Sequence, residues 1–201
     1  DGLVDFYLWG AKLEEWYEAT PFIESGRASE NVPTDWELPI NLSEPFSSWS
    51  TTGLASFSGG VADPDGGTSA WRLTEDTGDS RHRIADGFSV EAGKSYRVRV
   101  MAKSTNRKLI LNGNSLFGAG TASYDLQSGE IISSNAIAYM TETAPGSGWW
   151  ECVLEADVAS DKTFNLYVQM DNAGSDSNYV GDGSTMDLYD LSLTRLYQNP
   201  L

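Results

Sequence analysis

Apolar and polar residues alternate with a period of two along much of the chain. The segments 95–103 (SYRVRVMAK) and 162–171 (KTFNLYVQMD) each place apolar side chains on one face and more polar side chains on the other. Such alternation is typical of a strand that buries one of its two faces. Residues 186–196 (MDLYDLSLTRL) alternate too, with a shift of one position around Tyr189 and Asp190 that predicts a bulge.

Further short segments have the composition of strands, at 54–58, 69–74, 82–90, 107–112, 121–126, 136–142 and 149–156. Turns rich in glycine, proline or aspartate separate many of them, at 63–67, 91–94, 127–130, 144–146 and 181–183. Closely spaced short strands of this kind predict an all-β fold, a two-sheet antiparallel jelly-roll sandwich, rather than an alternating α/β fold.

The two ends of the chain resemble each other. Residues 1–16 (DGLVDFYLWGAKLEEW) and 182–196 (DGSTMDLYDLSLTRL) both begin with an Asp-Gly turn and continue as an apolar strand. We therefore interpret residues 1–25 as the terminal strand of a preceding similar module, 26–41 as a linker and 42–201 as one complete β-sandwich module. The alternative is a chance resemblance between two amphipathic strands.

The chain is strongly acidic, because 13 Lys and Arg stand against 29 Asp and Glu, a formal net charge of −16. Phosphate backbones and anionic membrane surfaces would repel it, so we expect no nucleic-acid partner. It has no run of 18 apolar residues, so we expect no membrane insertion. The single cysteine, Cys152, lies in an alternating strand and is expected to be buried rather than reactive. Because the sequence begins at Asp1, we interpret it as a mature product or a fragment of something longer.

Several short motifs occur in an order that resembles a known β-sandwich family. They are 7–15 (YLWGAKLEE), 62–67 (ADPDGG), 81–84 (RHRI), 90–96 (VEAGKSY), 124–129 (YDLQSG), 148–152 (GWWEC) and 179–183 (YVGDG). Together they resemble the β-sandwich modules of bacteriophage tail-fibre and head-fibre proteins. That family is similar to the carbohydrate-binding jelly rolls attached to bacterial polysaccharide-degrading enzymes. Residues 190–192 (DLS) depart from the phage type and look more like the enzyme-attached type.

The side chains that hydrolysis usually requires are scarce. His82 is the only histidine, and no Gly-x-Ser-x-Gly motif is present. A pair of carboxylates for glycoside hydrolysis arises easily by chance among 29 acidic residues, so such a pair would not be specific. We therefore predict a chain that is not an enzyme, in which His82 is structural or touches a ligand.

One face of the strand at 162–171 carries groups that suit a sugar. Tyr167 is flanked by the amides of Asn165 and Gln169. A pyranose packs its C–H face on an aromatic ring, and its hydroxyls pair with planar polar groups. The predicted ligand site also includes donors for an acidic glycan, the histidine and a tryptophan: Arg81, Arg83, Arg97, Arg99, His82 and Trp150. The alternative for the arginines is that they pair with neighbouring carboxylates on a solvated face.

Oxygen ligands for a structural calcium ion are also present. Asp63 and Asp65 lie in a glycine-rich turn whose carbonyls are further ligands for such an ion. The resemblance to the enzyme-attached jelly rolls implies a Ca²⁺ near Asp190, with Glu44 from the start of the module. The alternative is that these carboxylates cap plain Asx-turns. The sequence leaves the two interpretations open.

The sequence supports three hypotheses for the function. The leading one is a non-catalytic attachment module of a phage fibre that binds a polysaccharide or surface glycan of the host. One alternative is a carbohydrate-binding module of a secreted polysaccharide-degrading enzyme. The other is a purely structural virion module that makes subunit contacts through exposed aromatic rings. The resemblance implies a virion or extracellular location and, in a fibre, a homo-oligomer, although the sequence has no heptad or other oligomer signal.

Overall fold

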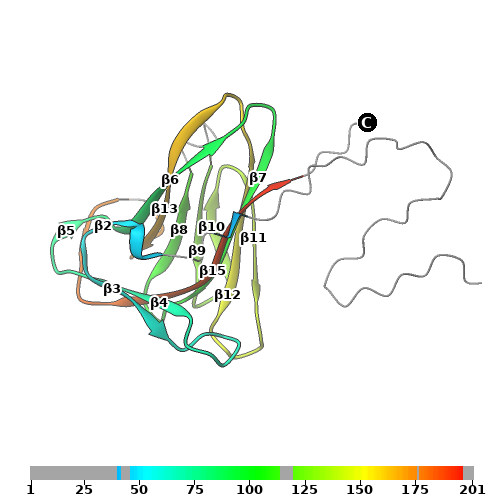
Figure 1. Cartoon of the computed structure of the whole chain (residues 1–201). Helices are drawn as coiled ribbons and strands as arrows, with labels where there is room; N and C mark the ends of the chain where they lie inside the picture. Colours follow the sequence, from blue (N-terminus) through cyan, green and yellow to red (C-terminus); the bar gives the residue numbers. More distant parts are fainter. Residues whose placement is uncertain (1–39, 42–45, 114–119, 176, 197–201) are drawn as a thin grey trace, which may run out of the picture. The chain divides into compact units, whose positions relative to one another are not determined.

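The computed structural model describes residues 40–41, 46–113, 120–175 and 177–196 (Figure 1). Within these residues the secondary structure consists of strands and one short 3-10 helix, η1 (Phe46–Ser48). The predicted terminal strand at 1–25 and most of the predicted linker at 26–41 lie outside the described residues. The division into modules therefore stays a prediction.

The first of two large sheets is antiparallel, with the strand order β11-β12-β7-β15-β4-β3. The short strand β1 also pairs with β15. Its strands are β1 (Ile40–Asn41), β3 (Leu54–Val61), β4 (Ala70–Glu75), β7 (Ser95–Lys103), β11 (Ile137–Glu142), β12 (Trp150–Asp157) and β15 (Thr185–Leu196). The register of β15 against β7 shifts between Tyr189 and Ser192, and Asp190 has a φ of +49°. The predicted bulge is therefore confirmed, at a residue type that tolerates the left-handed conformation.

The second large sheet is also antiparallel, in the order β10-β9-β8-β13-β6-β2. Its strands are β2 (Ser50–Thr52), β6 (His82–Val90), β8 (Lys108–Asn112), β9 (Thr121–Asp125), β10 (Glu130–Ser134) and β13 (Lys162–Asp171). A small two-stranded sheet joins β5 (Asp79–Ser80) to β14 (Tyr179–Val180). The predicted two-sheet antiparallel jelly-roll sandwich is confirmed.

The core lies between the two large sheets and follows from the alternation. In β7, Val98, Val100 and Ala102 are fully buried while the residues between them reach the surface. In β13, Leu166 and Val168 are fully buried from the opposite side. These residues belong to one contiguous hydrophobic cluster that draws on both sheets. Burial of apolar surface in such a cluster is the main force that holds two sheets face to face.

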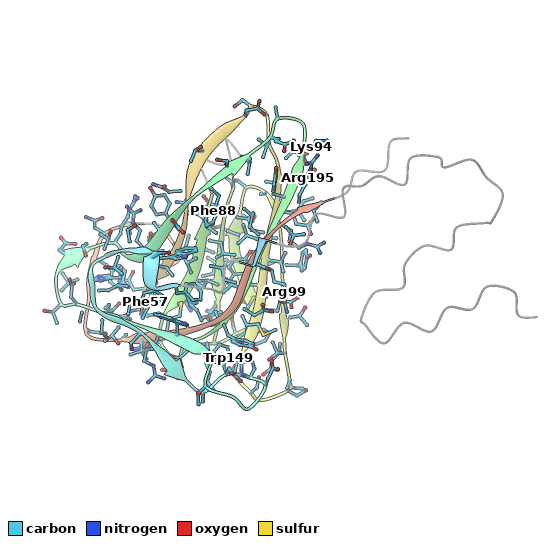
Figure 2. The ribbon with its side chains drawn as sticks, viewed as in Figure 1. Phe57, Phe88, Lys94, Arg99, Trp149 and Arg195 are labelled. Carbon is cyan, nitrogen blue, oxygen red and sulfur yellow. The ribbon has the colours of Figure 1, made fainter. Side chains whose placement is uncertain are left out.

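Aromatic rings close one edge of the sandwich. The ring of Phe46 in η1 lies 5.5 Å from that of Trp49, 5.7 Å from that of Phe57 and 5.7 Å from that of Trp71. Trp49 also approaches Phe88, at 5.9 Å. Phe57 and Trp71 belong to the first sheet and Phe88 to the second (Figure 2 labels both phenylalanines). Aromatic contacts of this length stabilise beyond their burial, so η1 fastens the two sheets together.

A buried ion pair between Glu75, at the end of β4, and Arg107, just before β8, also holds the loop before β15. The carboxylate of Glu75 accepts hydrogen bonds from Arg107 Nε (3.0 Å) and Nη2 (2.5 Å), from the hydroxyl of Tyr179 (2.6 Å) and from the backbone amide of Asp182 (2.8 Å). Glu75 is 1% exposed. The hydrogen bond from Ser184, and to a smaller extent that from Arg107, lower the pKa of Asp182, which also contacts the guanidinium. Every acceptor position of Glu75 therefore has a donor, as a buried charge requires.

We predict that Glu75→Gln destabilises the fold by about 3–5 kcal/mol, the usual cost of removing one partner from a buried ion pair. The amide would present two N–H donors to groups that are themselves donors. Urea unfolding monitored by tryptophan fluorescence measures the change. Glu130→Gln is the matched control, because Glu130 is exposed, and it should change stability by no more than about 0.5 kcal/mol. Equal effects of the two substitutions would contradict the prediction.

Candidate functional site

The candidate site is the outer face of the second sheet, called the polar face below. Strand register places its members in three rows across β2, β6, β13, β8 and β9. The first row contains Ser50, Ala85, Tyr167, Asn112 and Thr121, the second Thr52, Arg83, Gln169, Ile110 and Ser123, and the third Asp171, Lys108 and Asp125. Asn165 lies beyond the first row on β13. The rows alternate with residues that are mostly apolar and face the core, and they themselves are polar except for Ala85 and Ile110.

A stacked pair of side chains lies on this face. The guanidinium of Arg83 lies 4.1 Å from the centroid of the Tyr167 ring, in a cation–π contact. The exposed Asn165 donates a hydrogen bond from Nδ2 to the hydroxyl of Tyr167 at 3.3 Å. Three of the residues that the sequence assigned to a ligand site are thus brought into contact, although Arg83 is 84 positions from Tyr167 in the chain.

Beside the stacked pair the polar face contains hydrogen-bonding atoms without partners. Gln169 pairs across the sheet with Arg83, is 0% exposed, and neither its Nε2 nor its Oε1 has a hydrogen-bond partner among the residues that the structure describes. The same holds for Arg83 Nε, Thr121 Oγ1 and Asp171 Oδ2, which are buried and unpartnered. A buried polar group without a partner costs about 1–3 kcal/mol. Such a group in a native protein calls for a specific explanation, such as an ordered water or a ligand.

The loop after β13 folds back against the third row. Asp171 Oδ1 accepts hydrogen bonds from the backbone amides of Ala173 (2.7 Å), Gly174 (2.5 Å) and Ser175 (3.3 Å). Ser123 Oγ donates to the carbonyl of Gly174 at 2.9 Å. Gly174 has a φ of +76°, and a Cβ there would lie 2.8 Å from the side chain of Ile132. The loop is therefore built to lie close to the sheet, beside the unpartnered atoms.

The charges on the polar face are unevenly distributed. In the third row Lys108 forms an ion pair with Asp125. Burial raises the pKa of Asp125, but the hydrogen bonds from Lys108 and from two backbone amides outweigh it and leave the pKa lowered. Asp171 keeps one carboxylate oxygen without a partner. The acidic side chains of the polar face thus lie in the third row, and Arg83 lies in the row next to it.

The structure separates Arg97 and Arg99 from Arg83. Both lie on β7, on the outer face of the first sheet (Figure 2 labels Arg99). Arg97 pairs with Glu155 at 2.6 Å, and Arg99 pairs with Glu151 at 2.6 Å and with Asp190. For these two arginines the alternative interpretation, pairing with carboxylates, is the one the structure shows. They form no cluster with the polar face.

Of the remaining predicted ligand residues, His82 and Trp150 lie towards the interior. His82 is fully buried, with Nδ1 against the carbonyl of Gly53 and Nε2 3.2 Å from the carbonyl oxygen of Tyr179. Arg81 is partly buried just before β6. Trp150 is half-buried and packs against the core, next to the buried Trp149. Trp150 pairs with Ala102 and shares its inward direction.

The carboxylates predicted to bind calcium have protein partners instead of facing one another. Asp63 accepts hydrogen bonds from the amides of Asp65 (3.1 Å), Gly67 (2.7 Å) and Ser69 (2.9 Å). These bonds, Ser69 first, lower its pKa despite some burial. Asp65 accepts a hydrogen bond from Tyr189, which raises the pKa of that phenol to about 12. Asp190 pairs with Arg99, and Glu44 lies outside the described residues. No group of three or more metal-binding side chains converges in the part of the chain that the structure describes.

The single cysteine and the single histidine of the chain are both buried. Burial raises the pKa of the Cys152 thiol, which keeps it protonated, and the Glu151 carboxylate beside it acts in the same direction. His82 is held between two backbone carbonyls.

No helix among the described residues is long and apolar enough to cross a membrane.

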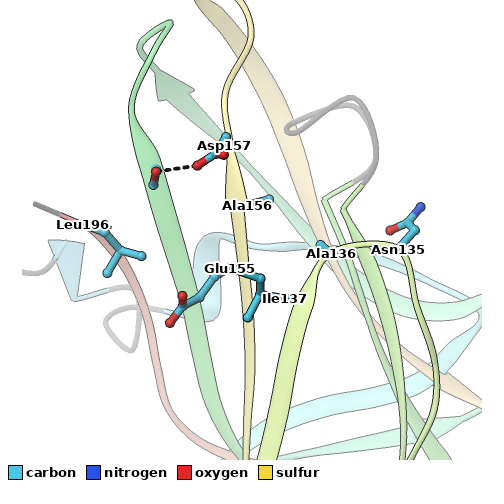
Figure 3. A pocket seen from close by; sticks show the side chains of 8 residues that line it. Asn135, Ala136, Ile137, Glu155, Ala156, Asp157 and Leu196 are labelled. Carbon is cyan, nitrogen blue, oxygen red and sulfur yellow. Dashed lines mark hydrogen bonds between the residues drawn. The ribbon is translucent and has the colours of Figure 1, made fainter. Parts of the chain in front are cut away.

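A separate pocket of about 290 Å³ lies on the first sheet, near the ends of β7, β12 and β15 (Figure 3). Its lining residues are Ser95, Asn135, Ala136, Ile137, Glu155, Ala156, Asp157 and Leu196. Within it Ser95 Oγ donates to Asp157 at 2.5 Å. It contains none of the residues predicted to bind a ligand, and its polar groups have partners in the protein.

Comparisons with known proteins give distant structural neighbours. No protein-family model and no curated sequence matches the chain. The chain is similar to the CBM22-1–GH10 modules of endo-1,4-β-D-xylanase 10B from Clostridium thermocellum, complexed with xylohexaose, with 13% identity and a TM-score of 0.49 over 82% of this chain and 29% of that one. It is also similar to a CBM4 structure (11%, 0.40, covering 76% and 81%) and to TmCBM27, a carbohydrate-binding module that recognises mannan (11%, 0.34, 78% and 94%). Because these TM-scores are below 0.5, the fold rests on the strand pairing of this chain.

We keep the calcium ion as a prediction with a direct test. A cation that binds only the folded chain raises the melting temperature, by mass action. If calcium binds as the resemblance implies, millimolar CaCl₂ raises the melting temperature relative to EDTA by several degrees, and Asp190→Asn abolishes that rise. Differential scanning calorimetry measures both, with MgCl₂ as the control salt. Identical melting temperatures with CaCl₂ and EDTA would contradict the prediction.

Proposed function

We propose that this chain is a non-catalytic carbohydrate-binding module that binds a polysaccharide on the polar face of the second sheet. The observation that carries the proposal is the set of buried, unpartnered hydrogen-bonding atoms on Gln169, Arg83, Thr121 and Asp171, beside the Tyr167 ring. These atoms include donors and acceptors together. Sugar hydroxyls donate and accept, so they can satisfy both kinds.

The arrangement suits a sugar rather than an apolar ligand. A planar amide next to a tyrosine ring offers a hydroxyl two hydrogen bonds and offers the C–H face of a pyranose a surface to pack on. Asn165 is exposed and Tyr167 is half-buried, while Gln169, two residues further along β13, is fully buried. Because Gln169 is buried, we propose that the Arg83 side chain shifts across the Tyr167 ring on binding, so that a sugar hydroxyl reaches the amide of Gln169. The bound sugar then supplies the hydrogen-bond partners that these atoms lack in the free chain.

The larger protein that carries this module is a further part of the proposal. The solved neighbours include a module attached to a xylanase and a module that recognises mannan, and this favours a carbohydrate-binding module of a polysaccharide-degrading protein. The phage-fibre attachment module predicted from the sequence uses the same polar face for the same kind of ligand. The two contexts differ in the remaining protein, which is either a catalytic domain or a fibre.

The test of the proposed function is Gln169→Leu, which has a similar volume and no polar atoms. We expect it to leave the free energy of unfolding unchanged or to raise it, because an unpartnered buried amide is removed. We expect the same substitution to weaken polysaccharide binding at least about tenfold, the effect of losing hydrogen bonds worth about 1.4 kcal/mol or more. Affinity gel electrophoresis against a panel of soluble polysaccharides measures binding, and urea unfolding measures stability.

Two controls make this test specific. Tyr167→Ala should weaken binding without unfolding the chain, because the ring lies on the surface side of the strand. Arg97→Gln, on the outer face of the other sheet, should leave binding unchanged. If Gln169→Leu keeps full affinity for a bound polysaccharide, the polar face is not the binding site. If no polysaccharide in the panel retards the chain, the proposed function is wrong, and a structural role through subunit contacts takes its place.

A further inference from the structure

Arg83, on β6 of the second sheet, has different partners from the arginines of the first sheet and of the buried network around Glu75. Five arginines have a carboxylate within 4.0 Å, namely Arg72, Arg97, Arg99, Arg107 and Arg195. For Arg83 no carboxylate of the described residues lies within that distance, and its guanidinium lies over the Tyr167 ring. The chain has 29 acidic residues to 13 basic ones. In this acidic chain Arg83 therefore differs from these arginines, because it has no carboxylate partner among the described residues.

The neighbours of Arg83 in its own row and in the first row are uncharged, whereas the third row, on its other side, contains Asp171. Strand pairing places Thr52 and Gln169 on either side of it, and Ala85 and Tyr167 in the adjacent row. Asp86 is close in sequence but alternates towards the opposite face, and its Oδ1 accepts the amide of Gly87 at 2.8 Å. The buried Nε of Arg83 has no acceptor. A guanidinium presents Nε and Nη as a fork that fits a planar carboxylate with two parallel hydrogen bonds.

We infer that the polysaccharide bound by the polar face is acidic, with a sugar carboxylate that pairs with Arg83 while the guanidinium lies on the Tyr167 ring. This inference rests on the proposed function and names its substrate class. A carboxylate supplies the acceptor that Nε lacks and neutralises the cation. The hydroxyls of the same or the next sugar reach the amide of Gln169.

The acidic third row gives the ligand a direction. Asp171 lies two residues from Gln169 along β13, roughly 7 Å away, and keeps Oδ2 unpartnered. An unpartnered carboxylate oxygen accepts a sugar hydroxyl and repels a second carboxylate. Lys108 gives no compensation there, because Asp125 pairs with it. A polymer with neutral sugars between acidic ones therefore fits better than one in which every sugar is acidic. The rest of the −16 charge acts weakly, since the screening length at physiological salt is about 8 Å.

The experiment compares each acidic polysaccharide with its own carboxyl-reduced form, in which the carboxylates become neutral hydroxymethyl groups. The panel contains alginate, hyaluronan and glucuronoxylan with their reduced forms, and neutral xylan, mannan and β-glucan. We expect an acidic member to bind at least about tenfold more tightly than its reduced form, because a hydrogen bond to a charged group is lost on reduction. Isothermal titration at 150 mM NaCl measures the affinities.

The variant Arg83→Gln separates the two levels of the proposal. We expect it to bind the acidic and the reduced polymer with equal affinity, while Arg97→Gln keeps the wild-type preference. Circular dichroism and urea unfolding check that both variants are folded. If a neutral polymer binds as tightly as any acidic one and Arg83→Gln does not change the ratio, the inference is overturned and the proposed function stands. Absence of binding to every member of the panel overturns both.

Discussion

The pairing register of β13 between β6 and β8 is the constraint on which both the core and the candidate site depend. One side of this strand places Leu166, Val168 and Met170 in the interior, fully buried. Its other side forms the middle of the polar face. Because the side-chain period of a strand is two, a slip of one residue would exchange the two faces and place the amide of Gln169 in the core. Burial of the apolar side therefore fixes the position of the polar side as well.

The outer faces of the two sheets show opposite solutions for similar residues. On the first sheet the arginines of β7 lie opposite the glutamates of β12, since Arg97 pairs with Glu155 and Arg99 lies near Glu151. Ion pairs on a surface of this kind contribute little to stability but leave no group without a partner. On the second sheet Arg83 lies opposite an amide, and several polar atoms around it stay unpartnered. Groups arranged at a cost to folding are typical of binding sites, where a ligand satisfies them.

The remaining polar networks hold the loops at the end of the sandwich. Glu75 and Arg107 form a buried pair that also binds the segment around Tyr179 and Asp182. His82 contacts the carbonyls of Gly53 and Tyr179 from the beginning of β6. Both networks anchor β14 close to the strand that carries Arg83. They thus position the loops beside the edge of the polar face.

The fold class, the main strands and the bulge near Tyr189 follow from the amino-acid sequence, because alternation with a period of two is a local property of neighbouring residues. The sequence also placed Asn165, Tyr167 and Gln169 on one face for the same reason. It missed β10, where Ile131 and Ile132 are consecutive and break the alternation. Which arginine lies on that face depends on strand pairing in the tertiary structure. Arg83, Arg97 and Arg99 all alternate in strands, but pairing over long sequence separations gave carboxylates to two of them and none of the described carboxylates to the third. The contributions of Thr121 and Asp171 were likewise decided by register between strands, which no local pattern encodes.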